Sequence, residues 1–213
     1  IRTMYGAGIR AAAQHSQSPY SIFTHVPGLK VIVPSNPYDA KGLLIQAIRD
    51  NDPVVCFEHK SLYQSEGGVP EESYTIPFGE ANVVREGGDV TIIALGLMVN
   101  RSLEAAEALA ADGIECEVID PRTTSPLDDE TILESVENTG RAVIVDEASP
   151  RCNMATDISA LIAQQAFGAL EAPIEMVTPP HTPVPFAGSL EDLYVPDATK
   201  IETAVRRVAG YSR

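Results

Sequence analysis

Residues 29–58 have the sequence LKVIVPSNPYDAKGLLIQAIRDNDPVVCFE, which contains a complete strand–helix–strand pattern. The branched apolar run at 29–34 predicts a buried parallel strand, and apolar residues at helical spacing over 38–51 predict a helix. Ser35 or Asn36 can cap this helix, and Pro37 suits its first turn. A second strand follows at 54–58, so the stretch predicts a parallel sheet with a right-handed crossover.

A second α/β pattern follows a stretch rich in Gly, Pro and acidic residues at 64–79, which predicts an exposed linker. Its expected strands are 90–95, 114–119, 142–146 and 174–177. Its expected helices are 100–112, 128–139, 154–166 and 198–209. Strands that alternate with helices in this way predict a doubly wound, open, mostly parallel sheet. The expected organisation is one domain at 1–66, a linker at 67–79 and a second domain at 80–213.

Composition disfavours several classes of protein. The chain has 213 residues and a net charge of −15, so phosphate backbones are poor partners and we expect no nucleic-acid binding. No apolar run approaches the roughly 18 residues needed to cross a bilayer, so we expect no membrane association. The three cysteines are odd in number and widely spaced, which indicates reduced, mostly buried thiols in a cytoplasm: Cys56, Cys116 and Cys152.

The start of the chain carries little pattern. Residues 1–13 contain no complete strand–helix unit, and the first residue is Ile1. We therefore expect further sequence upstream, and an exposed apolar sheet edge where its strands would pair. Gly6 and Gly8 form only a GxG, which favours a backbone turn over a phosphate cradle. The usual phosphate loops, zinc motifs and hydrolase nucleophile elbow are absent from the sequence.

The four histidines are the first candidates for chemistry. His15 lies among polar neighbours ahead of a predicted strand, so it is open to either a catalytic role or a loop hydrogen bond. His25 precedes a Pro-Gly turn, which favours a turn residue. His59 follows a strand end and can face a cleft at the carboxyl edge of the sheet. His181 lies in a proline-rich loop, which favours a structural role or a protein contact.

A resemblance to a known family bears on the roles of these histidines. Residues 2–63 resemble the β subunits of thiamine-diphosphate-dependent 2-oxo acid dehydrogenases, and within that family the acetoin dehydrogenase type most closely. The match continues through the motifs GDVTIIALG, EVIDPRTTSPLD, VIVDEASPR and TPPHTPVPF. Residues 1–66 are similar to the later part of a pyrimidine-binding domain, and residues 80–213 are similar to a transketolase C-terminal domain.

The resemblance implies roles for particular residues. His15 matches the histidine of the family's HSQ motif, which lies in the active-site channel and exchanges protons with the cofactor adduct and the lipoyl sulfur. A potassium ion bound by backbone carbonyls is implied at four positions near a helix end: Ala47, Ile48, Asp50 and Asp52. The alternative at those positions is an ordinary helix terminus satisfied by water.

The resemblance also implies a cofactor, thiamine diphosphate with Mg²⁺ held mainly with the α subunit. The activating glutamate and the aromatic residues that pack on the cofactor are expected upstream of residue 1. Expected partners are an α subunit, a second β subunit and a lipoyl acyltransferase, in a cytoplasmic complex that cleaves acetoin or decarboxylates pyruvate or a branched 2-oxo acid. The isolated chain is expected to be inactive. The alternative is a non-catalytic module for subunit assembly and acyltransferase docking, for which the charge of −15 would suit a basic partner.

Overall fold

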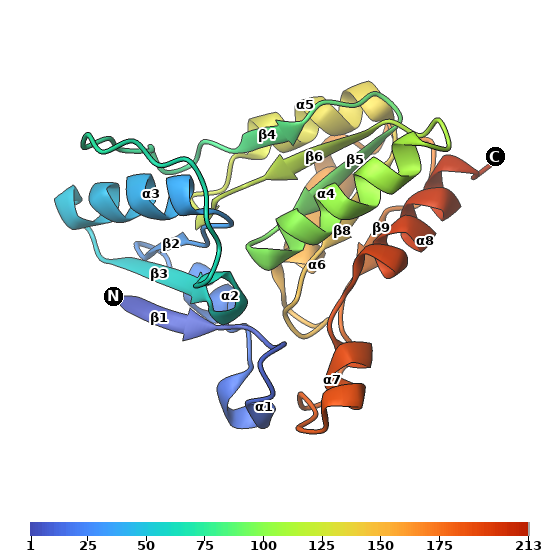
Figure 1. Ribbon diagram of the computed structural model, residues 1–213. Coiled ribbons are helices and arrows are strands. Elements are labelled where there is room, and N and C mark those ends of the chain that lie inside the picture. The colour runs from blue at the N-terminus through green and yellow to red at the C-terminus, as the bar shows by residue number, and fades with distance from the viewer. Residues whose placement is uncertain (213) are drawn as a thin grey trace.

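The computed structural model describes residues 1–212, which form two β-sheets and the helices around them (Figure 1). The strands are β1 (Arg2–Tyr5), β2 (Lys30–Ile32), β3 (Val54–His59), β4 (Asn82–Arg85), β5 (Val90–Ala94), β6 (Cys116–Asp120), β7 (Thr123–Ser125), β8 (Ala142–Val145) and β9 (Glu175–Val177). The α-helices are α1 (Ala12–His15), α2 (Tyr20–Thr24), α3 (Pro37–Arg49), α4 (Leu97–Ala110), α5 (Asp129–Thr139), α6 (Met154–Gln165), α7 (Gly188–Tyr194) and α8 (Ala198–Ala209), and a 3-10 turn, η1, covers Lys60–Leu62.

The first sheet has the strand order β1-β3-β2-β7 and contains the predicted strand–helix–strand unit. Strands β2 and β3 are parallel, with Val31 opposite Val55, and α3 connects them. The side chain of Asn36 caps α3 by accepting a hydrogen bond from the Asp39 amide at 2.8 Å. Helix α3 buries Leu43 against one face of the sheet. The sequence pattern thus predicted both the elements and the direction of pairing here.

Two strands of the first sheet were not expected from the sequence. Strand β1 pairs in parallel with β3 at one edge, with Arg2 opposite Cys56. Strand β7 pairs antiparallel with β2 at the other edge, with Val31 opposite Ser125. Because β7 follows β6 of the second sheet, it joins the two sheets directly. The polar triplet at 123–125 has neither an apolar run nor an alternating pattern, so nothing in its own sequence marks it as a strand.

The second sheet confirms the doubly wound prediction. Its order is β4-β6-β5-β8-β9, and β6, β5, β8 and β9 are mutually parallel. Strand β4, which was not expected, adds an antiparallel edge beside β6. Helices α4 and α8 pack together on one face, while α5 and α6 pack together on the other (Figure 1). Helix α8 has the predicted bounds, whereas α4 begins at Leu97, earlier than the expected residue 100.

A single apolar core connects the two sheets. Tyr5 and Phe57 of the first sheet share it with Ile93 and Ile144 of the second. The Tyr5 ring also meets the Tyr20 ring edge-on, with centroids 5.4 Å apart. Fully burying an aromatic or branched side chain contributes about 1.5–3 kcal/mol, and aromatic pairs add about 0.5–1.5 kcal/mol. The first sheet is therefore held against the second by burial as well as by β7.

The predicted linker contains no helix or strand, and it is only partly exposed. Residues 67–73 lie at the surface, as expected. Ile76, however, is buried and packs against the α3 face of the first sheet. The Lys41 ammonium also donates to the carbonyl oxygen of Glu72 at 2.9 Å. These contacts tie the segment to α3.

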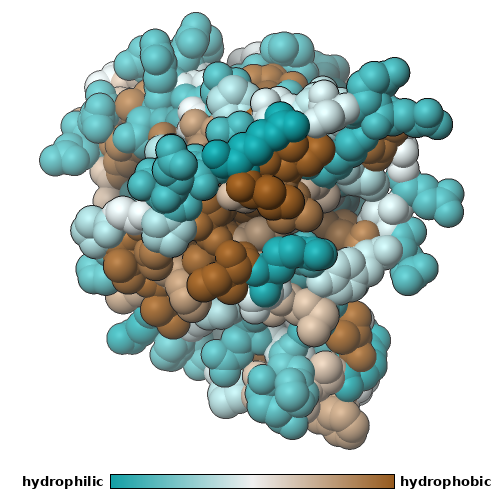
Figure 2. All heavy atoms as spheres, turned by 90° about the vertical axis from the view of Figure 1, so that its left-hand side faces the viewer, coloured by the Kyte–Doolittle hydropathy of each residue, from teal (hydrophilic) through white to brown (hydrophobic). Residues whose placement is uncertain are grey.

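An apolar area covers the middle of the face where β1 begins and α3 ends, as Figure 2 shows. Exposed large apolar side chains on these elements are Ile1, Met4 and Ile48. Strand β1 is an edge strand, so one side of its backbone has no strand partner in the described chain. Exposed apolar side chains therefore lie at this edge of the first sheet.

Candidate active site

His15 lies at the end of α1, beyond the carboxyl end of β1. Its side chain is exposed, has no hydrogen-bond partner among residues 1–212, and does not line the cavity described below. Its main chain is held instead, because the Lys60 ammonium donates to the His15 carbonyl oxygen. Partial burial lowers the pKa of Lys60, against the opposing effect of the Glu147 and Glu191 carboxylates.

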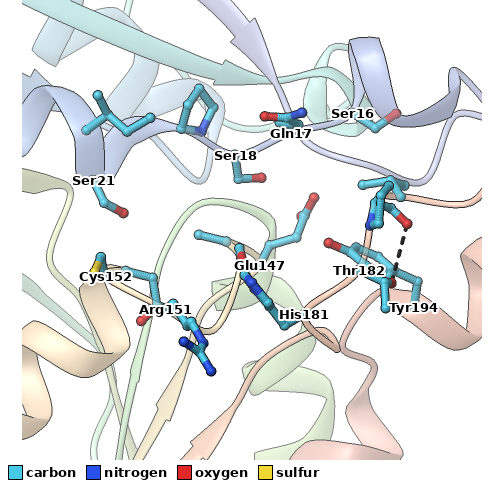
Figure 3. Close-up of a pocket in the computed structure, with 17 residues that line it drawn as sticks. Ser16, Gln17, Ser18, Ser21, Glu147, Arg151, Cys152, His181, Thr182 and Tyr194 are labelled. Carbon is cyan, nitrogen blue, oxygen red and sulfur yellow. Dashed lines mark hydrogen bonds between the residues drawn. The ribbon is translucent and has the colours of Figure 1, made fainter.

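The residues that follow His15 form one wall of a cavity of about 390 Å³ between the two sheets. Figure 3 shows Ser18 and Ser21 on one side, facing Glu147, Cys152 and His181 on the other. The size is at the lower end of the range for small-molecule pockets. The cavity is lined by Ser16, Gln17, Ser18, Pro19, Ser21, Ile22, Glu147, Ala148, Ser149, Arg151, Cys152, Asn153, His181, Thr182, Pro183, Val184 and Tyr194.

His59 does not face a cleft, contrary to the sequence expectation. Its side chain is fully buried, and its Nε2 lies 2.6 Å from Oε2 of Glu147, which is also buried. The Ser61 amide donates to His59 Nδ1 at 3.2 Å, which places the ring proton on Nε2, facing the carboxylate. Both residues lie at the carboxyl ends of parallel strands, so their contact joins the two sheets where the strands end.

The GxG segment is a backbone turn whose amides bind carboxylates of this same chain. The Ala7 amide donates to Glu147 Oε1 at 2.6 Å. The Gly8 and Arg10 amides donate to the two oxygens of Glu191, at 2.8 and 3.0 Å. Successive backbone amides commonly form anion-binding concavities. Here the anions are protein side chains, which accounts for the turn without a phosphate.

A second buried carboxylate supports the cavity wall from behind. The Tyr20 hydroxyl donates to Asp146, which also accepts from the amides of Ala148 at 2.8 Å and Ala155 at 3.1 Å. Burial raises the pKa of Asp146 above its usual range, while these hydrogen bonds act in the opposite direction. Burial and the charge of Asp146 also raise the pKa of Tyr20. The network fixes α2 against the start of α6.

The four residues predicted to bind potassium lie just before the amino end of β3, whereas His15 lies beyond the carboxyl end of β1. Ala47 and Ile48 are in the last turn of α3, where carbonyls lack helical partners, and Asp50 follows that turn. The Asp50 side chain is occupied by Lys30, whose ammonium lies 2.8 Å from both carboxylate oxygens. The Asp52 amide also donates to Asp50 at 2.8 Å. The Lys30 ammonium also lies 3.0 Å from Oδ2 of Asp52, so both carboxylates are paired with a cation, while the backbone carbonyls at the end of α3 can still bind an ion.

The remaining two histidines lie at the surface, and two of the three cysteines are buried. Exposed His25 ends α2, and exposed His181 lies 2.8 Å from the Ser149 hydroxyl at the cavity rim. Burial raises the pKa of Cys56 to about 12 and that of Cys116 to about 11. Cys152 is exposed.

Residues 1–212 contain no cluster of three or more His, Cys, Asp or Glu side chains suited to a metal. In the same range, no helix is both long and apolar enough to span a membrane.

Sequence reasoning missed Lys60, Glu147 and Glu191. A usable signal existed for Glu147, because it follows the apolar run at 142–145, as His59 follows its own apolar strand. Side chains after parallel strands gather at one edge of a sheet, so the two could have been paired. Glu191 had no such signal, because it lies within a short helix after a proline-rich loop.

Two family models match this chain. The model of the transketolase C-terminal domain matches residues 79–201, and that of the transketolase pyrimidine binding domain matches residues 1–66. The chain therefore belongs to the transketolase C-terminal domain family, with a pyrimidine-binding-type segment before that domain. Three similar curated proteins are each named as a subunit beta. An acetoin:2,6-dichlorophenolindophenol oxidoreductase subunit beta of Cupriavidus necator is 70% identical over 207 residues, which are 97% of this chain and 61% of that protein.

Two further relatives come from Bacillus subtilis. A subunit with the same name is 58% identical over 99% of this chain and 61% of its own length. A pyruvate dehydrogenase E1 component subunit beta is 48% identical over 99% of this chain and 65% of its own length. The chain thus spans about three fifths of the length of these relatives.

A solved structure supports the fold. A split-gene transketolase, described as an inactive beta4 tetramer, superimposes with a TM-score of 0.79 at 25% sequence identity. The match covers 100% of this chain and 67% of the other. The two-sheet arrangement is therefore that of transketolase-like proteins.

Proposed function

We propose that this chain is the β-subunit portion of a thiamine-diphosphate-dependent enzyme that cleaves acetoin and passes the acyl group to a lipoyl acyltransferase. The observation that carries the proposal is the 70% identity, across nearly the whole chain, to a protein named for acetoin oxidation. Identity falls to 48% for the pyruvate dehydrogenase relative. Pyruvate or a branched 2-oxo acid is therefore the second choice of substrate.

His15 is the catalytic residue in this proposal. Thiamine diphosphate, when bound, supplies the nucleophilic carbon for carbon–carbon cleavage. The exposed imidazole of His15 holds or moves a proton at the reacting oxygen or at the lipoyl sulfur, which suits a histidine near neutral pH. Its unpartnered side chain and anchored main chain support that role, because the ring is free while its base is fixed.

The cofactor's other contacts are assigned to partners. The two buried glutamates nearest the His15 loop, Glu147 and Glu191, already accept hydrogen bonds from this chain. We therefore assign the diphosphate and Mg²⁺ mainly to an α subunit, and we expect the isolated chain to be inactive. The description of the transketolase neighbour as an inactive β tetramer supports that expectation by analogy.

We also propose the division of the chain and its assembly. Residues 1–66 act as part of a pyrimidine-binding domain, 67–79 as the linker and 80–213 as the C-terminal domain, within a cytoplasmic complex that contains a second β subunit. A potassium ion binds the backbone carbonyls of Ala47, Ile48, Asp50 and Asp52. The free carbonyls in the last turn of α3 support this site, since they carry partial negative charge.

A chimeric enzyme tests the function. Residues 1–213 replace the matching segment of the Cupriavidus necator β subunit, and the chimera is produced with the α subunit of that enzyme. We expect acetoin-dependent reduction of 2,6-dichlorophenolindophenol, and a loss of about 10²–10⁴-fold in kcat for His15→Ala with unchanged assembly. His25→Ala, at an exposed histidine that does not line the cavity, is the matched control.

The outcomes separate the two candidate functions. Turnover that survives His15→Ala would leave the chain as a non-catalytic assembly or docking module, for which its charge of −15 is the supporting observation. Turnover of pyruvate in preference to acetoin would move the substrate to the second choice. An assembled chimera without activity toward either substrate would contradict the proposal.

A further inference from the structure

The loop that carries His15 is strained just before the histidine. Arg10 has φ of 60° and Ala12 has φ of 57°, and neither is glycine. Non-glycine residues persist in this left-handed region only where the surroundings fix them. Ala12 begins the single turn of α1 and His15 ends it, so the backbone at these two residues sets where the histidine lies.

Glu191 of α7 fixes Arg10 through both backbone and side chain. Its carboxylate accepts from the amides of Gly8 and Arg10, and the Arg10 guanidinium donates to the same carboxylate at 2.9 Å. The Glu191 side chain is fully buried, so water does not compete for these bonds. In Figure 1, α1 and α7 lie side by side, although they are far apart in the sequence.

A second set of contacts connects Glu147 to His15 through His59 and Lys60. Glu147 binds the Ala7 amide with one oxygen and His59 with the other. His59 is followed in the chain by Lys60, whose ammonium binds the His15 carbonyl oxygen. Two carboxylates thus hold the segment before α1, and Lys60 holds the last residue of that helix. We call Glu147, Glu191 and the amides of Ala7, Gly8 and Arg10 the loop clamp.

We propose that Glu191 is a positioning residue for His15, which acts by fixing the strained loop through the loop clamp. The inference rests on the catalytic role proposed above for His15. It assigns the C-terminal domain a part in catalysis, because that domain supplies both carboxylates while the histidine comes from the first 66 residues. Glu191 binds the loop amides and does not line the cavity, so its proposed effect on catalysis is through the position of His15.

The test uses the assembled chimeric enzyme with Glu191→Ala, and Glu104→Gln as control. Glu104 is an exposed carboxylate on α4 whose partner within residues 1–212 is Arg101. Hydrogen exchange measured by mass spectrometry over residues 6–15 should be about tenfold faster or more at Gly8 and Arg10 in Glu191→Ala, and unchanged in the control. The value of kcat should fall by about tenfold to 100-fold, because a 1 Å misplacement can cost about 10², while KM changes by less than about twofold.

A double mutant separates positioning from a merely structural effect. Glu191→Ala on the His15→Ala background should cause no further loss of kcat, since both act through one group. A full additional loss there, or unchanged exchange at Gly8 and Arg10, would overturn the inference. Glu191→Gln, which keeps one acceptor oxygen, should give intermediate values, and it replaces Glu191→Ala if that variant fails to assemble. If His15→Ala alone leaves kcat unchanged, the proposed function of His15 fails, while the exchange data still decide whether the clamp exists.

Discussion

The Nε2 atom of His59 lies 2.6 Å from a carboxylate oxygen of Glu147, and both side chains are buried. The first residue ends a strand of the first sheet, and the second follows a strand of the other sheet. Glu147 also accepts from the Ala7 amide. One carboxylate therefore satisfies two buried donors from the first 66 residues, and its loss would leave both unpaired.

We predict that Glu147→Ala lowers the free energy of unfolding by about 2–6 kcal/mol, because it leaves two buried donors unsatisfied at about 1–3 kcal/mol each. Glu147→Gln should cost about 1–3 kcal/mol, because its amide nitrogen leaves one of the two donors unsatisfied. Denaturant unfolding measures both values. Glu130→Gln, an exposed change on α5, is the control. Equal stabilities for Glu147→Ala and this control would refute the interpretation.

Gly6 allows the approach of the loop to His59. It has φ of 95°, and a Cβ atom built there would lie 2.2 Å from His59 Nε2. We predict that Gly6→Ala destabilises the protein by more than about 1 kcal/mol, since strain adds to the clash. Gly68 has no atoms near its Cβ position and no positive φ, so Gly68→Ala should be neutral or slightly stabilising. Thermal unfolding of the two variants compares them, and similar midpoints would contradict the prediction.

Local patterns in the sequence predicted most of the architecture. The apolar runs at 29–34 and 90–95, each followed by a helical pattern, led to β2–α3 and β5–α4 and to the parallel pairing of both sheets. These elements are defined by their own residues, because burial on both faces requires a continuous apolar run. The family resemblance that was expected from the motifs agrees with both matching domain models.

Features that depend on distant partners escaped prediction. Strand β7 is a strand only because β2 lies beside it, and the bond from Gly8 to Glu191 spans 183 residues of sequence. His15 was found through the resemblance, while the carboxylates that hold its loop were not. Their role depends on long-range contacts that periodicity and spacing do not report.

Potassium should stabilise the protein if the proposed carbonyl site at the end of α3 exists. At a potassium concentration 100 times the dissociation constant, binding adds about 2.7 kcal/mol to the free energy of unfolding. We expect a higher melting temperature in KCl than in tetramethylammonium chloride of equal ionic strength, and loss of the difference after dialysis against the larger cation. Ile48→Pro, which distorts the helix end, should reduce this difference in melting temperature more than Asp50→Asn does. Identical melting curves in the two salts would exclude the site.

Asp120 should make stability depend on pH. It is fully buried, accepts from the Ser35 hydroxyl, and accepts from the Arg122 amide at 2.8 Å. Burial raises its pKa from 3.8 to about 7, against the effect of these hydrogen bonds. Between those two values the folded protein holds a proton that the unfolded chain has released. Stability must therefore fall as pH rises through this window, with a slope of up to about 1.4 kcal/mol per pH unit.

The variant Asp120→Asn removes this titration and keeps the shape of the side chain. Its free energy of unfolding should vary less between pH 4.5 and 7.5, roughly the window set by the two pKa values, so the stability curves of variant and parent should diverge as pH rises. Asp112→Asn, an exposed change at a pair with Arg206, should leave the curve parallel to the parent. Other buried carboxyls, such as Asp146, contribute equally to all three proteins and cancel in the comparison. Parallel curves for Asp120→Asn and the parent would mean that Asp120 stays ionised in its buried site, with the Ser35 and Arg122 hydrogen bonds outweighing desolvation.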